Sequence, residues 1–216
     1  MPIARAWTIP VEPATVRASA AVVVGREVRG AFDERESTLE EHKRNAGAVQ
    51  SFFEPVVWPD DAEAAVEFLA SNEWPHHGRP NLSRQQAAEV SLAGDGIVSF
   101  WDKAGSEAVG LIRVFDLEDR DVGSPLLDIR IAAAHRGRSL GTSAVSWVVD
   151  HLFTTYGELH RIEATTRHDN LPMQRVLDRC GFRLEGRMLE AWTNADGSRA
   201  DTWTYAILRR EWSARK

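Results

Sequence analysis

One segment constrains the fold of this chain more than any other: an apolar run at Leu126–Ile131, a short loop, and a helical pattern at Ser139–Tyr156. Apolar residues recur every four positions in the second pattern, which predicts a helix with one buried face (Leu140, Ala144, Val148, Leu152, Tyr156). The segment therefore predicts a strand that leads directly into a helix.

The loop between them, His135–Thr142, reads HRGRSLGT. It combines the unpaired N–H groups and positive dipole end of a helix with small residues, through which a backbone can approach an anion closely. Arg136 and Arg138 would add positive charge. Taken alone, the loop fits a pyrophosphate site and an ordinary glycine-containing turn about equally well.

The remaining pattern alternates hairpins with helices. Upstream, it predicts a strand, two helices and an antiparallel hairpin with Gly105 in its turn (Phe52–Val57, Pro59–Ser71, Ser83–Ala93, Ile97–Trp101, Ala108–Phe115). Downstream, it predicts a strand, a helix stopped by Gly181, and two strands around a turn (Arg161–Thr166, Leu171–Cys180, Phe182–Arg187, Asn194–Gly197, Thr202–Leu208). Such alternation predicts a mixed α+β fold.

Charge divides the chain near residue 50. Residues 1–50 carry seven basic and seven acidic residues, whereas the whole chain has a net charge of -6, so we expect an extension of unassigned role at 1–50 and one domain at 51–216. The acidic balance argues against a nucleic-acid partner.

No apolar run approaches the roughly 18 residues of a membrane span. A single cysteine, Cys180, excludes an internal disulfide and suits the cytoplasm.

The order of motifs from Leu126 to Trp212 resembles the GNAT superfamily of N-acetyltransferases, especially its ribosomal-protein alanine acetyltransferase-like branch. The family motif Arg/Gln-x-x-Gly-x-Gly/Ala falls on Arg136, Ser139 and Gly141, with Ser139 in place of the first glycine. Further matches follow in order (His160–Ala164, Asn170, Gly181-Phe182, Glu185-Gly186, Asp196-Gly197, Asp201, Tyr205, Glu211-Trp212). A weaker match begins at Phe52.

The resemblance implies a GNAT fold: a twisted, mostly antiparallel sheet flanked by helices and splayed between its two central strands. It implies acetyl-CoA as co-substrate and direct transfer of the acetyl group to a primary amine of a small molecule or of a peptide or protein N-terminus. The backbone of Ile129–Ala132 would hold the pantetheine arm, and the loop would hold the pyrophosphate. The cofactor residues implied are Ile129, Arg130, Ile131, Arg136, Gly137, Arg138, Ser139, Leu140, Gly141, Thr142, Asn170 and Arg175.

Two residues are candidates for catalysis. Asp128 is the preferred base, because alternation along the strand turns it away from Ile129 and Ile131. The alternative is a structural ion pair with Arg130 or Arg113. Asn170 occupies a family position near the cofactor thiol, but it also suits a helix N-cap. The serine that protonates the thiolate in many relatives is replaced by Met173, so the general acid is unassigned.

The connection Trp74–Pro80 carries the candidate acceptor-binding residues Trp74, His76 and His77. The alternative is a proline-stiffened connection whose tryptophan covers the core. These histidines lack a ligand partner at metal-binding spacing, so we expect no metal. An acidic loop could attract a cationic acceptor such as a polyamine, or be simply solvated (Asp116, Glu118, Asp119, Asp121).

Two other functions compete. Gly137–Gly141 also matches the Gly-x-Ser-x-Gly elbow of serine hydrolases, with Ser139 as nucleophile, but the preceding antiparallel hairpin does not suit that fold. The missing serine also permits a non-catalytic acyl-CoA-binding module. A homodimer is an open alternative to a monomer.

Overall fold

The computed structural model describes residues 52–118 and 124–216. The expected extension at 1–50, together with Asp119 and Asp121 of the acidic loop, lies outside the described residues. Within the described part, no helix is long and apolar enough to cross a membrane.

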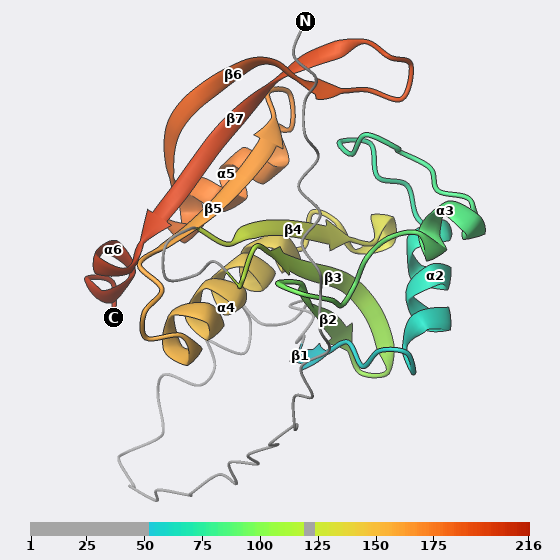
Figure 1. The fold of residues 1–216 in the computed structure, drawn as a ribbon, viewed down its shortest axis with the longest axis horizontal. Helices are drawn as coiled ribbons and strands as arrows, with labels where there is room; N and C mark the ends of the chain where they lie inside the picture. The colour runs from blue at the N-terminus through green and yellow to red at the C-terminus, as the bar shows by residue number, and fades with distance from the viewer. Residues whose placement is uncertain (1–51, 119–123) are drawn as a thin grey trace, which may run out of the picture. The chain divides into compact units, whose positions relative to one another are not determined.

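The centre of the fold is a seven-stranded sheet with the order β1-β2-β3-β4-β5-β7-β6 (Figure 1). Its strands are β1 (Phe52–Pro55), β2 (Val98–Ala104), β3 (Glu107–Phe115), β4 (Leu126–Ile131), β5 (Arg161–Arg167), β6 (Arg183–Thr193) and β7 (Arg199–Leu208). The helices are α2 (Ala62–Ala70), α3 (Arg84–Ala88), α4 (Leu140–Thr155), α5 (Leu171–Cys180) and α6 (Arg209–Ser213), with a 3₁₀ turn η1 (Ala133–His135). The mixed α+β architecture is confirmed.

The two central strands, β4 and β5, run parallel, whereas all the other neighbouring strands are antiparallel. They pair only at Leu126 with Glu163 and at Leu127 with Ala164. Beyond Leu127 the strands separate, so the expected splay is present. Among the described residues, one edge of β4 therefore has no neighbouring strand from Asp128 onward.

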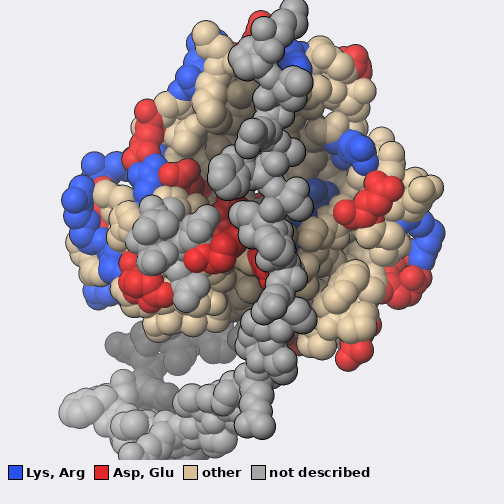
Figure 2. Space-filling model, in the orientation of Figure 1, with Lys and Arg blue, Asp and Glu red and all other residues tan. Residues whose placement is uncertain are grey.

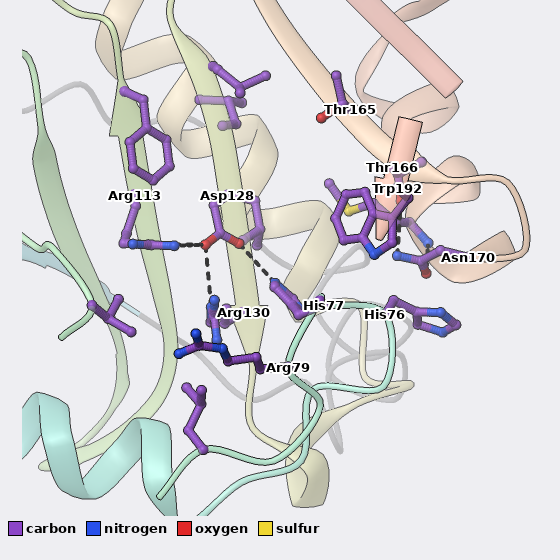
Figure 3. Close-up of a pocket in the computed structure, with 18 of the residues that line it drawn as sticks. His76, His77, Arg79, Arg113, Asp128, Arg130, Thr165, Thr166, Asn170 and Trp192 are labelled. Atoms are coloured by element: carbon purple, nitrogen blue, oxygen red, sulfur yellow. Dashed lines mark hydrogen bonds and ion pairs between the residues drawn. The ribbon is translucent and has the colours of Figure 1, made fainter. Parts of the chain in front are cut away.

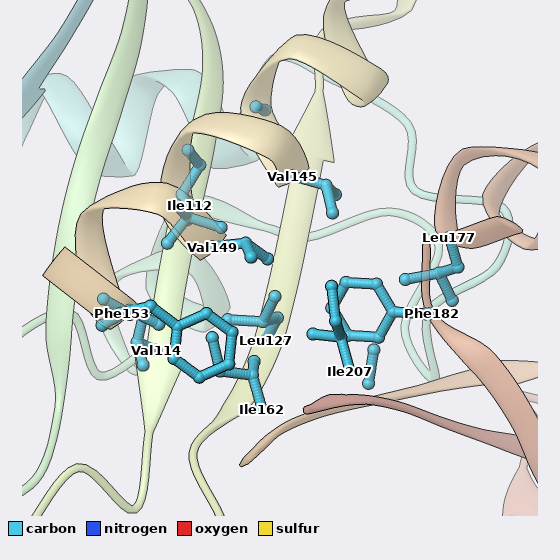
Figure 4. Packing of buried hydrophobic residues seen from close by; sticks show 14 of the residues in the cluster. Ile112, Val114, Leu127, Val145, Val149, Phe153, Ile162, Leu177, Phe182 and Ile207 are labelled. Carbon is cyan, nitrogen blue, oxygen red and sulfur yellow. The ribbon is translucent and has the colours of Figure 1, made fainter. Parts of the chain in front are cut away.

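The sheet carries an apolar core on each face. The larger core lies against α4 and α5, with Val145 and Val149 of α4 near Leu127 of β4 and Leu177 of α5 (Figure 4). The smaller core packs α2 and α3 through Phe68, Leu69 and Ala87 against Trp101 and Leu111 of the sheet (remaining buried members: Ala65, Trp74, Leu92, Ala132). Because both faces are covered, β4 is held rigidly between two packed layers.

Elements with a strong local signal match their predictions, and those governed by packing do not. Helix α4 buries the predicted Leu140, Ala144, Val148 and Leu152, and α5 ends at Gly181 with φ +86°. Ser83 caps α3, the helix expected from this residue onward, in a capping box with Gln86, but α3 ends at Ala88 instead of about Ala93. Strand β6 extends to Thr193, and α6 was not predicted. Strand β6 pairs with β7 along its length through two register shifts, and α6 follows the end of β7.

Charged side chains are interspersed on the face drawn in Figure 2, where acidic and basic residues of the described segments alternate. Several of them form surface ion pairs, such as Arg161 with Glu185 and Arg84 with Glu63. This face presents no large patch of a single sign among the described residues.

Candidate active site

The start of α4 is shaped by a left-handed turn. Ser139 has φ +64° and ψ 4°, a conformation that a glycine adopts without strain, and Gly137 before it has φ +76°. The Ser139 hydroxyl makes no capping hydrogen bond, and the first backbone hydrogen bond of the helix is from Ser143 N to Ser139 O. The N–H groups at the start of the helix (Leu140, Gly141, Thr142) are therefore available to an anion.

The two arginines of the loop differ in what they contact. Arg136 donates from Nε to Ile131 O at 2.9 Å and from a terminal nitrogen to Glu73 O, and its guanidinium lies over the Trp74 ring. Arg136 thus connects the loop to the end of β4 and to Glu73, which follows α2. Arg138 is exposed and makes no hydrogen bond or ion pair with the described residues. Of the two predicted sources of positive charge, Arg138 is the one whose guanidinium no other described residue occupies.

Alternation along β4 determines which backbone groups face the splay. Ala132 N donates to Val109 O of β3, and Glu163 N of β5 donates to Pro125 O. Odd-numbered residues therefore direct their backbone groups toward β5, and even-numbered ones toward β3. Ile129 and Ile131 face the gap, where Ile131 O already accepts from Arg136. The backbone of Arg130 faces β3, so the expected pantetheine contact from Arg130 is not supported.

A cavity of about 530 Å³ opens beside this edge. Its wall includes residues of β3, β4, β5, α5 and the connection after α2 (Figure 3). Predicted site residues that line it are His76, His77, Asp128, Ile129, Arg130 and Asn170. Sequence reasoning missed others that line it, among them Arg79, Thr165, Thr166 and Trp192. Trp192 belongs to the part of β6 that the sequence pattern did not reveal.

Asp128 is the centre of a buried charge cluster. Its carboxylate accepts from Arg113 Nε at 3.0 Å, from Arg130 Nε at 3.3 Å and from His77 Nε2 at 3.1 Å (Figure 3). Burial by itself raises the pKa of Asp128, but the hydrogen bond from His77 and the charges of Arg130 and Arg113 outweigh burial and hold this pKa well below its usual range.

The cluster argues against Asp128 as the general base, and that role stays a prediction that no contact of the described residues supports. A carboxylate with so low a pKa is a weak proton acceptor near neutral pH. The structural alternative, an ion pair with Arg113 or Arg130, is realised with both partners at once. Its position on β4, turned away from Ile129 and Ile131, is as expected from alternation.

Trp74 is a correction to the predicted acceptor site. Its side chain is 1% exposed, its Nε1 donates to Leu69 O at 2.9 Å, and its ring contacts Phe68 and His77. A side chain so buried cannot contact an acceptor, and the alternative of a core tryptophan is the one observed. Instead, the Trp74 ring packs against the His77 ring in an edge-to-face arrangement, with an angle of 75° between the two ring planes.

His76 and His77 both lie at the cavity but have different partners. His76 Nδ1 is 3.9 Å from Asp169 Oδ1, and burial together with the charge of Arg167 lowers the pKa of His76 despite this carboxylate. His77 contacts Asp128 directly. His77 is thus coupled to the buried cluster, and His76 to the more exposed Arg167–Asp169 pair.

Asn170 serves as the N-cap of α5. Its Oδ1 accepts from Met173 N at 3.3 Å, and its Nδ2 donates to Thr166 Oγ1 at 3.0 Å. The capping role is confirmed, while the catalytic role stays a prediction. Arg175 lies exposed on α5, and its predicted contact with the 3′-phosphate also stays a prediction.

Several other polar groups lie in the core or away from the cavity. Tyr205 is 3% exposed in the larger core, and burial raises its pKa. Burial also raises the pKa of Cys180 to about 11, which makes it a poor nucleophile. Asp116 and Glu118 do not line the described cavity.

Among residues 52–118 and 124–216, no group of three or more histidine, cysteine or carboxylate side chains could hold a metal ion.

Comparison with known proteins decides the family. Residues 49–183 match the family model of the acetyltransferase (GNAT) domain. The chain belongs to the GNAT acetyltransferase family. This GNAT domain has a sheet splayed between β4 and β5, and Ser139, which stands at the position of the motif's first glycine, takes a left-handed conformation. Among the described residues, no histidine forms a hydrogen bond with Ser139, so the hydrolase alternative lacks its base.

Two curated relatives come from bacilli. The chain is 28% identical over 99 residues to an uncharacterized N-acetyltransferase, p20, of Bacillus licheniformis, covering 46% of this chain and 54% of the relative. It is 35% identical over 78 residues to the probable N-acetyltransferase YjcK of Bacillus subtilis, covering 36% of this chain and 42% of that relative. The matches span about half the length of these relatives.

Solved structures share the fold. Mycobacterium smegmatis RimJ in complex with CoA-disulfide has a TM-score of 0.61 at 24% identity, over 76% of this chain and 85% of RimJ. Spermidine N-acetyltransferase from Vibrio cholerae in complex with CoA and spermine has a TM-score of 0.62 at 20% identity, over 76% of this chain and 98% of that chain. At these identities the likeness extends to the fold alone.

Proposed function

We propose that the protein is an acetyl-CoA-dependent N-acetyltransferase that acts directly on a primary amine of a small molecule or of a peptide or protein N-terminus. The observation that carries the proposal is the open edge of β4, which lies between an uncapped helix start and a cavity with room for an acceptor. Each of the two reactants thus has a separate approach to the splay.

The residues present suit coenzyme A. The N–H groups of Leu140, Gly141 and Thr142 and the side chain of Arg138 offer donors for a pyrophosphate. The backbone of Ile129 faces the gap and suits an amide-bearing arm such as pantetheine. When bound, acetyl-CoA supplies an acetyl group activated as a thioester. The predicted contacts of Asn170 and Arg175 are part of the same proposal.

The charges that line the cavity indicate which class of acceptor amine suits it. Three guanidinium groups line it, against two carboxylates (Arg79, Arg113, Arg130; Glu89, Asp128). Arg113 and Arg130 already share Asp128, and Arg79 lies 3.7 Å from Glu89. A polycation would meet more positive than negative charge here, so we rank an amine with one positive charge, such as a peptide N-terminus, above a polyamine.

The test has two stages. First, we expect acetyl-CoA to raise the unfolding temperature of the full chain, since a ligand that binds only the folded state stabilises it. Second, release of free thiol is followed with an alanine-initiated peptide, spermidine and kanamycin as acceptors. Turnover with the peptide above that with spermidine supports the proposal. Absence of both stabilisation and turnover refutes it, and stabilisation without turnover identifies the non-catalytic acyl-CoA-binding module.

The domain boundary and assembly are proposals of the same kind. We assign the catalytic domain to residues 51–216 and an extension to 1–50, and we leave the homodimer as an alternative to the monomer. Removal of residues 1–50 with retention of acetyl-CoA binding would support this division, and light scattering would distinguish the two assemblies.

A further inference from the structure

We propose that His77 is the proton acceptor of the transfer reaction and that Asp128 is a positioning residue that fixes the His77 tautomer. This inference rests on the proposed acetyltransferase function. It replaces the direct role expected for Asp128 by an indirect one, in which the carboxylate acts through the ring it contacts.

The hydrogen bond between the two residues determines which ring nitrogen is basic. His77 Nε2 lies 3.1 Å from Asp128 Oδ1. An ionised carboxylate can only accept, so Nε2 must carry the hydrogen of this bond. In a neutral ring the lone pair is then on Nδ1. Nδ1 makes no hydrogen bond with a described residue, so it is available to an acceptor amine.

The surroundings keep Asp128 in the ionised form that this geometry needs. Arg113 from β3 and Arg130 from β4 both contact its Oδ2, which leaves Oδ1 for His77. The side chains of Arg113 and Arg130 are only 12% and 8% exposed. Water competes little for such buried groups, so the carboxylate stays fixed as a partner for Nε2.

His77 also lies where an acceptor must arrive. In Figure 3 it stands between the Asp128 cluster on one side and Trp192, Thr166 and Asn170 on the other, on the wall of the cavity. The other charged or titratable groups around it are its neighbour His76, with Arg79 and Glu89 on the same wall. The His77 side chain is 26% exposed, so it is accessible from the cavity while its ring is held by Asp128 and Trp74.

The chemical step balances with this assignment. The amine nitrogen forms a bond to the acetyl carbon, the carbon–sulfur bond breaks, and the sulfur keeps the bonding electron pair. The proton lost by the nitrogen moves to Nδ1 of His77, and the resulting imidazolium returns it to solvent. The thiolate takes a proton from solvent, so the products are an amide and a thiol. Asp128 stabilises the imidazolium without taking its proton.

The tautomer can be measured on the wild-type chain without any acceptor. In ¹⁵N nuclear magnetic resonance of the ring nitrogens, we expect neutral His77 to carry its hydrogen on Nε2 and to show an unprotonated Nδ1. The Asp128→Asn variant should lose this preference, because an amide can donate to Nε2. A neutral His77 with its hydrogen on Nδ1 in the wild-type chain overturns the proposal.

The kinetic test compares His77→Gln with wild type, using whichever acceptor of the peptide, spermidine and kanamycin panel is turned over fastest. General base catalysis typically contributes about 10²–10⁴-fold, so we expect kcat/KM to fall by roughly that factor at high pH. Protonated His77 is no base, so the wild-type to variant ratio should shrink as pH falls. This ratio cancels the ionisation of the amine, which is common to both proteins.

The control is His160→Gln, a change at an exposed histidine outside the cavity that should leave the pH profile unchanged. A wild-type to His77→Gln ratio that is near one, or that does not vary with pH, overturns the role of His77. If the wild-type chain turns over no amine, the proposed function fails instead. Equal stabilisation of wild type and His77→Gln by acetyl-CoA excludes misfolding as the cause of lost turnover.

Discussion

Replacing Asp128 by asparagine removes the only carboxylate that contacts both Arg113 and Arg130 among the described residues. The change keeps the size of the side chain and one oxygen acceptor. It therefore isolates the effect of the charge on the stability of the fold, apart from any role in catalysis.

The structure gives the expected size of this effect. The side chains of Asp128, Arg113 and Arg130 are 17%, 12% and 8% exposed, so solvent can offset little of the lost pairing. Removing one partner of a buried ion pair costs about 3–5 kcal/mol. Since the asparagine oxygen still accepts one hydrogen bond, we expect the lower end, about 3 kcal/mol. For a chain of this size that lowers the unfolding temperature by roughly 6–12 °C.

The assay is thermal and denaturant unfolding of the full chain near pH 7. The matched control is Glu63→Gln, which removes a carboxylate from the exposed pair with Arg84 and should leave the unfolding temperature unchanged. If Asp128→Asn unfolds at the wild-type temperature, the Asp128 cluster does not depend on charge and the reasoning is refuted.

The pH dependence gives a second check on the same variant. The pKa of Asp128 is lowered in the folded chain, so its contribution is fully present above the unfolded pKa of about 3.9 and is lost as the pH falls through the folded value. The stability difference between wild type and Asp128→Asn should be constant from about pH 8 to pH 5 and shrink below about pH 4. A difference that grows on acidification contradicts the assigned pKa direction.

Three further predictions concern the loop and the core. Ser139→Gly should raise the stability by about 1 kcal/mol, because glycine adopts the φ of +64° without strain; a lower unfolding temperature would contradict this. Arg138→Ala should weaken acetyl-CoA binding about fivefold, measured by calorimetry at low salt, with unchanged stability of the free chain; equal affinity would remove Arg138 from the cofactor site. Cys180, with its pKa raised to about 11, should react slowly with a thiol reagent at pH 8 and rapidly once the chain is unfolded; fast labelling of the folded chain would contradict its burial.

The elements that carry the cofactor loop could be predicted because their signals are local. The spacing of Leu140, Ala144 and Val148 determines the buried face of α4, and Gly181 supplies the left-handed residue that ends α5. Strand β4 was predicted with the bounds that the structure has. Each of these depends on neighbours a few residues away, so the order of residues contains the necessary information.

The full length of β6 was not predictable in the same way. Its residues are mostly exposed and lack a clear alternation, and the strand forms because it pairs with β7 through irregular register shifts. Trp192 reaches the cavity only through this pairing. Its place in the site therefore depends on contacts that sequence periodicity does not record.

The sequence by itself determined the family and the loop at the start of α4, because a strand, a small-residue turn and a helix create an anion site from the backbone alone. Only the tertiary structure decided the chemistry of the side chains around it. Trp74, His77, Arg113 and Asp128 come from three separate segments, and packing buries the first and brings the other three together. A charge or a ring acquires its role from the partners that surround it, and folding supplies those partners.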